Sequence, residues 1–551
     1  MEKFYVTDTS LSARFPIYTR GNVGEVFPDP VTPLTSGTTL WFAELGWQDT
    51  WVRIGAFGPE EFPEGEFSQL GVLGGYCYLN ASLVRIFGER GPGLSWEIMD
   101  NAIFGVQPGV PPYAEMDGDV RPEATAKMGE TFGYVLSQSR IEDLTELMED
   151  RATTVELRRS RPDLTSLTDA ELVERYLTLA AAHRHLFAHH IFVTFLATLP
   201  VGIISGVATA VGRPDLILPI IAGIGDVDSA APSYAMWELS RLDPASPEFT
   251  AGFEAFLYEF GSRGPNEWET RSPTWETRPA LALSAIDRMR AAPDSMAPVG
   301  QNAIRAAQRE AASAELLAIV EGDPAVHGQL QAGINSSKAW LPGRERTKTN
   351  NIRHIHEMRV SMRELGRRMV ERGVFDEVED FGFVTKEELD TLVNDPASLT
   401  DVIRVRRAEY AALQELTPPF VVVGSDEGPS TWTRRDAHRV DQLSSGATLQ
   451  GMPGCGGFAE GTARVILDSN DPSALEPGDI LVAPITDPSW TPLFVPAAAV
   501  VVDVGAVMSH AIIVSRELGI PCVVSATDAT RRIPNGARIR VDGDTGIITI
   551  L

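Results

Sequence analysis

A serine and a histidine, Ser509 and His510, follow a valine-rich apolar run and precede a segment whose apolar spacing predicts a helix. The predicted order over residues 500–526 is strand, tight loop, helix and strand, with a helix stop at Gly519 and Pro521. We expect the Ser509 hydroxyl to cap the helix, which places His510 at the first helical position. Free backbone N–H groups and the helix dipole favour an anion there. His510 could therefore carry a phosphoryl group, or it could be only a polar residue near a helix start.

The last hundred residues resemble the mobile phosphohistidine domain of the phosphoenolpyruvate (PEP)-utilising dikinase family. Four stretches carry the resemblance: GMPGCGGFAEGTARV, DILVAPITDPSWTPLF, SHAIIVSRELGIPCVV and VDGDTGIITI. The resemblance implies that His510 takes a phosphoryl group from a nucleotide and then gives it to an acceptor. It also implies that Gly505, Ser509 and Arg516 belong to the phosphohistidine loop.

Two earlier loops hold polar residues that could contact the acceptor or the phosphoryl group. A segment stiffened by prolines holds Arg20 and Glu25, and it is similar to the entry of the acceptor domain in rifampin phosphotransferases. An irregular loop holds Arg263 and Glu267, and it is similar to the family's Gly-x-Arg-Gly-x-x-Glu loop. Guanidinium donors suit phosphoryl oxygens. The first segment could instead be a proline-stiffened surface loop that binds no ligand, and Arg263 and Glu267 could simply pair to hold their loop in shape.

The most basic stretch of this acidic chain covers residues 344–369. Arg344, Lys348 and His356 are candidates to line the cleft where the phosphohistidine arrives, because the transferring phosphoryl group must be neutralised. A solvated helix face, or pairing with nearby acids, would explain most of these charges as well.

Composition limits the classes of protein to which the chain can belong. At 551 residues the chain is long enough for two or three domains. Its formal charge of -28 argues against nucleic-acid binding and against anionic membranes. Its three cysteines lack metal-ligand spacing, so we expect no metal site and no disulfide framework. Without an apolar leader, the chain is expected to be cytoplasmic.

The apolar pattern predicts a multidomain α+β fold. We expect an acceptor-binding domain, mostly α-helical, followed by a small α/β swivelling domain that carries the histidine. No long helical period precedes about residue 114, whereas apolar residues recur at helical spacing after it. The expected ranges are 1–416 for the acceptor domain (mixed over 1–115, mainly helical over 116–415), 417–447 for a linker and 448–551 for the swivelling domain.

One apolar segment, residues 191–212, carries no charge and is long enough to span a bilayer. Pro200, Gly202 and Gly206 interrupt it. We therefore predict two buried helical pieces that meet near Leu199–Gly202, and no membrane span.

No Gly-x-x-x-x-Gly-Lys loop and no ATP-grasp sequence is found. The order of acceptor domain and histidine domain resembles rifampin phosphotransferases without their ATP-grasp part, and split systems of the phenylphosphate synthase type. The resemblance implies a phosphotransferase subunit that works with a separate ATP-grasp subunit, which binds most of the ATP and Mg²⁺.

The expected acceptor is a small phenolic hydroxyl compound, which would place the protein in aromatic compound catabolism. A rifamycin-type antibiotic and pyruvate are alternative acceptors. A non-enzymatic phosphohistidine relay, passing phosphate to another protein, is an alternative from a different functional class.

Overall fold

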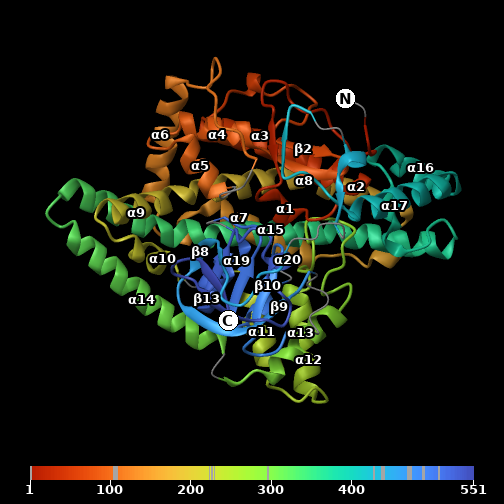
Figure 1. The fold of residues 1–551 in the computed structure, drawn as a ribbon. Coiled ribbons are helices and arrows are strands. Elements are labelled where there is room, and N and C mark those ends of the chain that lie inside the picture. The colour runs from red at the N-terminus through yellow and green to blue at the C-terminus, as the bar shows by residue number, and fades with distance from the viewer. Residues whose placement is uncertain are drawn as a thin grey trace.

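The structure is a computed structural model that describes residues 3–103, 109–222, 224, 228, 230–294, 297–425, 428–435, 441–467, 475–486, 490–506 and 509–551. Helices and an N-terminal sheet form one body, and a β-rich C-terminal body lies against the long helix α15 (Pro324–Glu371), as Figure 1 shows. The predicted multidomain α+β class is confirmed.

The N-terminal region is built on a small antiparallel sheet. Its strands, in the order β2-β3-β1-β5, are β2 (Leu70–Leu73), β3 (Tyr76–Asn80), β1 (Ile17–Thr19) and β5 (Val421–Val423). The helices here are α1 (Val23–Val26), α2 (Pro33–Thr35), α3 (Trp41–Ile54), α4 (Ala81–Arg90) and α5 (Trp96–Ile103).

Helix α3 contradicts the expectation that no long helix precedes residue 114. Its buried residues include Glu44, Gly46 and Thr50 beside Trp47 and Trp51, so polar and apolar residues alternate irregularly along a helix that packs against α8. A helix buried on much of its circumference shows no clean apolar period, which is why the pattern missed it.

The helical region is arranged around α15, which packs against α7, α8 and α9. Its helices are α6 (Pro122–Ser137), α7 (Thr145–Arg159), α8 (Asp169–Leu196), α9 (Thr198–Ala210), α10 (Ile217–Ile220), α11 (Ala231–Ser240), α12 (Pro247–Phe260), α13 (Ala280–Ala291), α14 (Pro298–Ile319), α15, α16 (Leu389–Asn394) and α17 (Thr400–Gln414).

The uncharged segment 191–212 falls into two helical pieces, as predicted. The break comes at Ala197, slightly earlier than expected, because Pro200 occupies the first turn of α9, where no backbone N–H needs a partner. Together α8 and α9 form one stretch, Asp169–Ala210, that is long and apolar enough to cross a membrane. More than half of its most apolar window, 56%, is buried inside the protein, as in a core helix.

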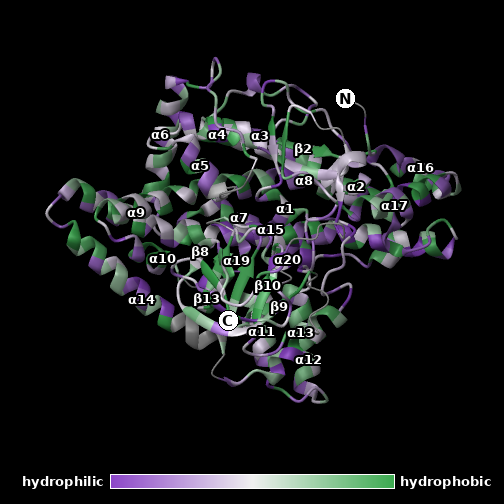
Figure 2. Cartoon of the chain, viewed as in Figure 1, coloured by the Kyte–Doolittle hydropathy of each residue, from purple (hydrophilic) through white to green (hydrophobic). Residues whose placement is uncertain are grey.

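The C-terminal body is an eight-stranded sheet in the order β7-β14-β13-β9-β10-β11-β12-β8. Strands β9 to β12 run parallel, and β10 is hydrophobic along its length (Figure 2). The strands are β7 (Thr448–Gln450), β8 (Met452–Cys455), β9 (Phe458–Val465), β10 (Ile480–Ala483), β11 (Ala499–Val502), β12 (Cys522–Val524), β13 (Arg538–Asp542) and β14 (Ile547–Ile550), and the helices are α18 (Thr491–Phe494), α19 (His510–Leu518) and α20 (Ala529–Arg532).

The segment expected to be a linker, residues 417–447, also contributes strands to two sheets. Strand β5 pairs with β1 and so completes the N-terminal sheet, and β4 (Leu416–Thr417) pairs with β6 (Thr433–Arg434). Three consecutive valines, Val421–Val423, are a β-prone run that the turn-forming residues around them obscured.

The two bodies share apolar packing. Helices α11, α12 and α13 contribute Trp237, Phe256 and Ile286 to the same hydrophobic cluster as Leu481 and Val500 of the C-terminal sheet. The structure therefore represents a docked arrangement, in which α19 faces the helical region.

Candidate active site

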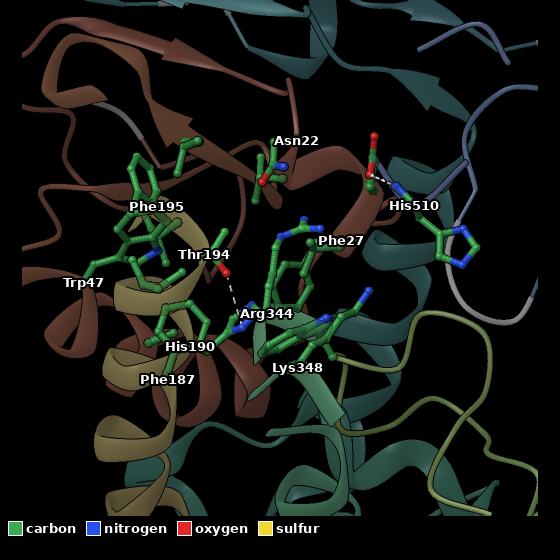
Figure 3. A pocket seen from close by; sticks show the side chains of 18 of the residues that line it. Asn22, Phe27, Trp47, Phe187, His190, Thr194, Phe195, Arg344, Lys348 and His510 are labelled. Carbon is green, nitrogen blue, oxygen red and sulfur yellow. Dashed lines mark hydrogen bonds between the residues drawn. The ribbon is translucent and has the colours of Figure 1, made fainter. Parts of the chain in front are cut away.

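A pocket lies where the C-terminal body meets the helical region, and it encloses about 1210 Å³ of empty space, part of which is open to solvent. Figure 3 shows an aromatic end formed by Trp47, Phe187 and Phe195, the cations Arg344 and Lys348 in the middle, and His510 at the far end. The pocket thus joins an apolar site to the predicted phosphohistidine.

His510 is the first residue of α19, directly after the loop that leaves the parallel strand β11. Carboxyl ends of parallel strands and helix N-termini are where phosphate-type ligands bind. Its Nδ1 lies 3.2 Å from Oγ1 of Thr486 and its Nε2 lies 3.1 Å from Oγ1 of Thr491. Phe494 packs edge-on against the ring, at 5.8 Å between centroids. Both ring nitrogens are therefore oriented by hydroxyl groups, and phosphorylation would replace one of these hydrogen bonds.

The surroundings keep the His510 imidazole neutral. Burial lowers its pKa well below the ordinary value of 6.5, and the nearby charges of Lys348, Arg263 and Arg344 lower it further. A neutral imidazole has the lone pair that a nucleophile needs.

The predicted phosphohistidine loop is only partly as expected. Ser509 has the extended backbone of an N-cap, but its Oγ has no hydrogen-bond partner among the described residues, so the predicted side-chain cap is wrong. A Cβ on Gly505 would lie 2.9 Å from Cβ of Val524 and 3.1 Å from the Ser509 Oγ, so the loop packs too closely for a side chain. Arg516 points elsewhere, and its Nε donates to the Gly454 carbonyl at 3.2 Å.

Arg344 and Lys348 lie one turn apart on α15, and both line the pocket. Arg344 pairs with Glu345, with 3.0 Å between the guanidinium and the carboxylate. Burial lowers the pKa of Lys348, although Glu267 and Glu345 act in the opposite direction. The pocket therefore places two cationic side chains on the same lining as His510, which is the kind of charge that phosphoryl transfer requires.

Arg263 and Glu267 are both buried and lie outside the pocket lining. Nε of Arg263 is 3.2 Å from a carboxylate oxygen of Glu267. The loop that carries them is fixed by Arg359, whose guanidinium donates to the carbonyls of Glu267 and Glu269. Arg263 still contributes positive potential, because it lowers the pKa values of both His510 and Lys348.

The proline-stiffened segment brings only one of its two candidates to the pocket. Glu25 lines it, and its Oε2 accepts a hydrogen bond from the backbone N–H of His510 at 3.4 Å. Arg20 is buried beneath it, where its guanidinium donates to the carbonyls of Cys77 and Phe27 at 2.6 and 2.8 Å. Arg20 therefore supports the segment and does not reach the pocket.

His356 does not belong to the pocket. Its Nε2 lies 2.7 Å from Oε2 of Glu276, which also pairs with Arg161 at 2.7 Å. His356 follows Lys348 by eight residues on α15, which moves it about 12 Å along the helix and about 80° around it. The structure thus removes His356 from the predicted site.

Sequence reasoning missed several pocket residues. Thr486 lies within one of the four quoted stretches, but nothing marked a single threonine as a partner of His510. His190 ends a cluster of four histidines, at 183, 185, 189 and 190, that directly precedes the apolar segment 191–212, and in the structure it lines the pocket between the aromatic end and Arg344 (Figure 3). Within the described residues, no group of three or more His, Cys, Asp or Glu side chains could hold a metal ion.

Comparisons with known proteins agree with this geometry. Residues 475–546 match the family model of the PEP-utilising enzyme mobile domain. Residues 240–345, which include all of α12, α13 and α14 and the N-terminal part of α15, match the fourth domain of rifampicin phosphotransferase. The likeness to PEP-utilising phosphotransferases is confirmed.

Among the relatives of this chain, rifampicin phosphotransferase from Streptomyces sviceus is 33% identical to it over 340 residues. These residues cover 61% of this chain and 37% of the relative. The protein of that name from Bacillus subtilis is 30% identical, over 57% of this chain and 36% of its own length. Another B. subtilis protein, the uncharacterised phosphotransferase YvkC, is 28% identical over 58% of this chain and 38% of its own. The chain thus spans little more than a third of these relatives.

A solved structure, holo aconitase X of Thermococcus kodakaraensis, matches 19% of this chain and 99% of its own at 24% identity, with a TM-score of 0.16.

Proposed function

We propose that this chain is the acceptor-binding and phosphohistidine-carrying part of an ATP-dependent phosphotransferase. His510 takes a phosphoryl group and passes it to the hydroxyl of a small aromatic acceptor. The observation that carries the proposal is the single pocket that holds the neutral His510, the cations Arg344 and Lys348, and the aromatic end.

ATP is bound by a separate ATP-grasp protein in this proposal. The aligned parts cover 37% and 36% of the two rifampicin phosphotransferases, and these residues contain no Gly-x-x-x-x-Gly-Lys loop that would support ATP binding by this chain itself. By analogy with the family, His510 takes the β-phosphate of ATP, with release of AMP and inorganic phosphate. Magnesium would enter with the nucleotide on the partner, and we derive no step through a metal in this chain.

In the second step, an acceptor oxygen attacks the phosphorus in line with the bond to the His510 nitrogen. The P–N bond breaks as the P–O bond forms, and its electron pair returns to the imidazole. Arg344 and Lys348 neutralise the charge on the phosphoryl oxygens. The histidine intermediate splits one transfer between distant sites into two local steps.

A phenolic ring suits the aromatic end of the pocket. Trp47 and Phe195 pack edge-on at 5.2 Å, and Phe187 lies beside Trp47, so an aromatic acceptor would meet ring faces and edges. A rifamycin-type antibiotic is the second candidate, because residues 240–345 match a rifampicin phosphotransferase domain. A protein-to-protein phosphate relay is less well supported, because a relay has no need of an enclosed aromatic pocket.

Cellular location is part of the proposal. All three cysteines are buried and unpaired, which supports a cytoplasmic protein.

Two assays test the two half-reactions separately. The chain is first combined with a candidate ATP-grasp protein, magnesium and ATP labelled at the β-phosphate, and acid-labile protein phosphate is measured for wild type and His510→Ala. The chain alone is then incubated with a labelled phenol and the matching phenyl phosphate, since a phosphoenzyme intermediate exchanges label between them.

Wild type should exchange label and His510→Ala should not. Exchange that persists in His510→Ala would exclude His510 as the carrier. Exchange with a rifamycin and its phosphate, but with no phenol, would identify a rifamycin-type antibiotic as the acceptor. Label that leaves His510 only for another protein would support the relay.

A further inference from the structure

Asn22 has a backbone conformation that a residue with a side chain rarely adopts. Its φ is 61° and its ψ is -59°, and the backbone N–H of Val23 donates to the Gly21 carbonyl at 2.7 Å. These values define a γ-turn with positive φ, which is rare and strained, whereas glycine adopts positive φ readily. Strained residues gather at ligand sites, so the surroundings of the Asn22 side chain become important.

Hydrogen bonds on both sides of the turn hold it in this conformation. Before the turn, the backbone N–H of Arg20 donates to the Phe420 carbonyl at 2.8 Å. The buried guanidinium of Arg20 donates to the carbonyls of Cys77 on β3 and of Phe27, directly after α1. Asn22 therefore cannot relax unless buried hydrogen bonds break, which is the condition under which backbone strain persists.

The turn brings the Asn22 side chain to the pocket, close to His510 along a chain of contacts. Asn22 lines the pocket, and Figure 3 shows its carboxamide between the aromatic end and His510. The backbone N–H of Glu25 donates to the Asn22 carbonyl at 2.9 Å, and the Glu25 carboxylate accepts from the backbone N–H of His510. Asn22 thus lies within one helical turn of the residue that contacts His510.

The Asn22 carboxamide is available to a ligand. It makes no hydrogen bond within the part of the chain that the structure describes, and it does not cap α1. It is also not one of the fully shielded polar atoms that lack a partner. A hydroxyl that enters the pocket brings one hydrogen, which needs an acceptor atom. Arg344 and Lys348 are donors only, whereas Oδ1 of Asn22 can accept it.

We propose that Asn22 is a positioning residue for the acceptor, and that its Oδ1 accepts the hydrogen bond of the acceptor hydroxyl. This inference rests on the proposed function, and it narrows the acceptor to compounds with a free O–H on the aromatic ring. The neutral amide takes up no proton, so its role is to bind and orient the hydroxyl. An ether at the same position would leave the carboxamide without this partner and would bind less well.

The substitution Asn22→Gly separates this role from a purely conformational one. Glycine removes the carboxamide and also relieves the strain of the positive φ, so the variant should melt no lower than wild type. The control is Asp528→Gly, at another non-glycine position with positive φ (57°), which precedes α20 and lies outside the pocket lining. It should melt no lower than wild type for the same reason.

The measurement is the binding of phenol and of anisole, its methyl ether, to the chain alone by ligand-observed NMR titration. The ratio of the two dissociation constants reports on the hydroxyl hydrogen, because the rings are the same. In Asn22→Gly the preference for phenol over anisole should fall about two- to tenfold, as expected for one neutral hydrogen bond. In Asp528→Gly the preference should equal that of wild type.

An unchanged preference in Asn22→Gly would overturn the role of Asn22, since a carboxamide that binds the hydroxyl cannot be lost without effect. An equal fall in Asp528→Gly would overturn it as well. Wild type that binds neither compound would overturn the phenolic acceptor of the proposed function. Wild type that binds phenol and exchanges label, with an unchanged preference in Asn22→Gly, would overturn this inference alone.

Discussion

The backbone N–H of His510 donates to Oε2 of Glu25 at 3.4 Å, although 485 positions separate the two residues. The contact joins the first turn of α19 to α1. A carboxylate thus lies near the helix end where a phosphoryl group on His510 would be favoured. Two anions would repel each other there, so Glu25 favours docking of the unphosphorylated histidine domain.

Glu25→Ala should therefore weaken docking of the unphosphorylated chain, and Glu25→Gln should weaken it less, because the amide keeps an acceptor oxygen. Because this hydrogen bond is long, we expect a contribution of about 0.5–1.5 kcal/mol, which corresponds to about two- to tenfold in a docking equilibrium. Small-angle X-ray scattering would show a larger radius of gyration for Glu25→Ala. The exposed Glu64→Ala serves as control, and equal radii for all variants would contradict this role.

The cations of α15 should matter only for transfer to the acceptor. We expect Arg344→Met and Lys348→Met each to lower phenol exchange by at least 100-fold, because charge neutralisation of a transferring phosphoryl group accounts for factors of this size or larger. Arg353→Met, on the same helix but paired with Glu259, is the control. A similar loss of exchange in Arg353→Met would mean that the substitutions act by destabilising α15 and not by removing charge from the pocket.

The part of the site closest to His510 in sequence was predictable because its signals are local. Strand β11, the break at Gly505 and the start of α19 all follow from short-range patterns, and Gly519 ends α19 in the left-handed conformation at φ 72° that its type predicts.

Long-range partners could not be predicted in the same way. From the sequence alone, Arg20 and Glu25 are equally good candidates for the site. In the structure, Arg20 is buried against its own sheet, whereas Glu25 contacts His510. Likewise Lys348 and His356 share a helix, and only tertiary packing decides that His356 faces Glu276. Residue type indicates what a side chain can do, whereas the partner depends on how distant segments pack.

The loop before Ser509 should tolerate no side chain at Gly505. A Cβ would lie 2.9 Å from Val524 Cβ, so Gly505→Ala should destabilise the C-terminal domain by about 1–3 kcal/mol through overpacking. Gly129→Ala in α6 is the matched control, because its Cβ would meet no atom within 4 Å and alanine favours a helix. Calorimetry should show a lower melting temperature for Gly505→Ala and an equal or higher one for Gly129→Ala. An unchanged melting temperature for Gly505→Ala would mean that the loop relaxes.

Buried histidines should make stability depend on pH. Burial, and then His354, lower the pKa of His183 well below 6.5. Below pH 6.5 the unfolded chain protonates this residue while the native chain does not, so His183 costs about 1.4 kcal/mol of stability per pH unit as the pH falls. His183→Asn should therefore show a shallower decline than wild type between pH 6.5 and 5. Asp503, whose pKa burial raises to about 7, acts with the opposite sign, but it is common to both proteins and cancels in the difference. The measurement is the urea unfolding midpoint of each protein at each pH. If the midpoints of wild type and His183→Asn fall in parallel with pH, His183 is protonated in the native chain.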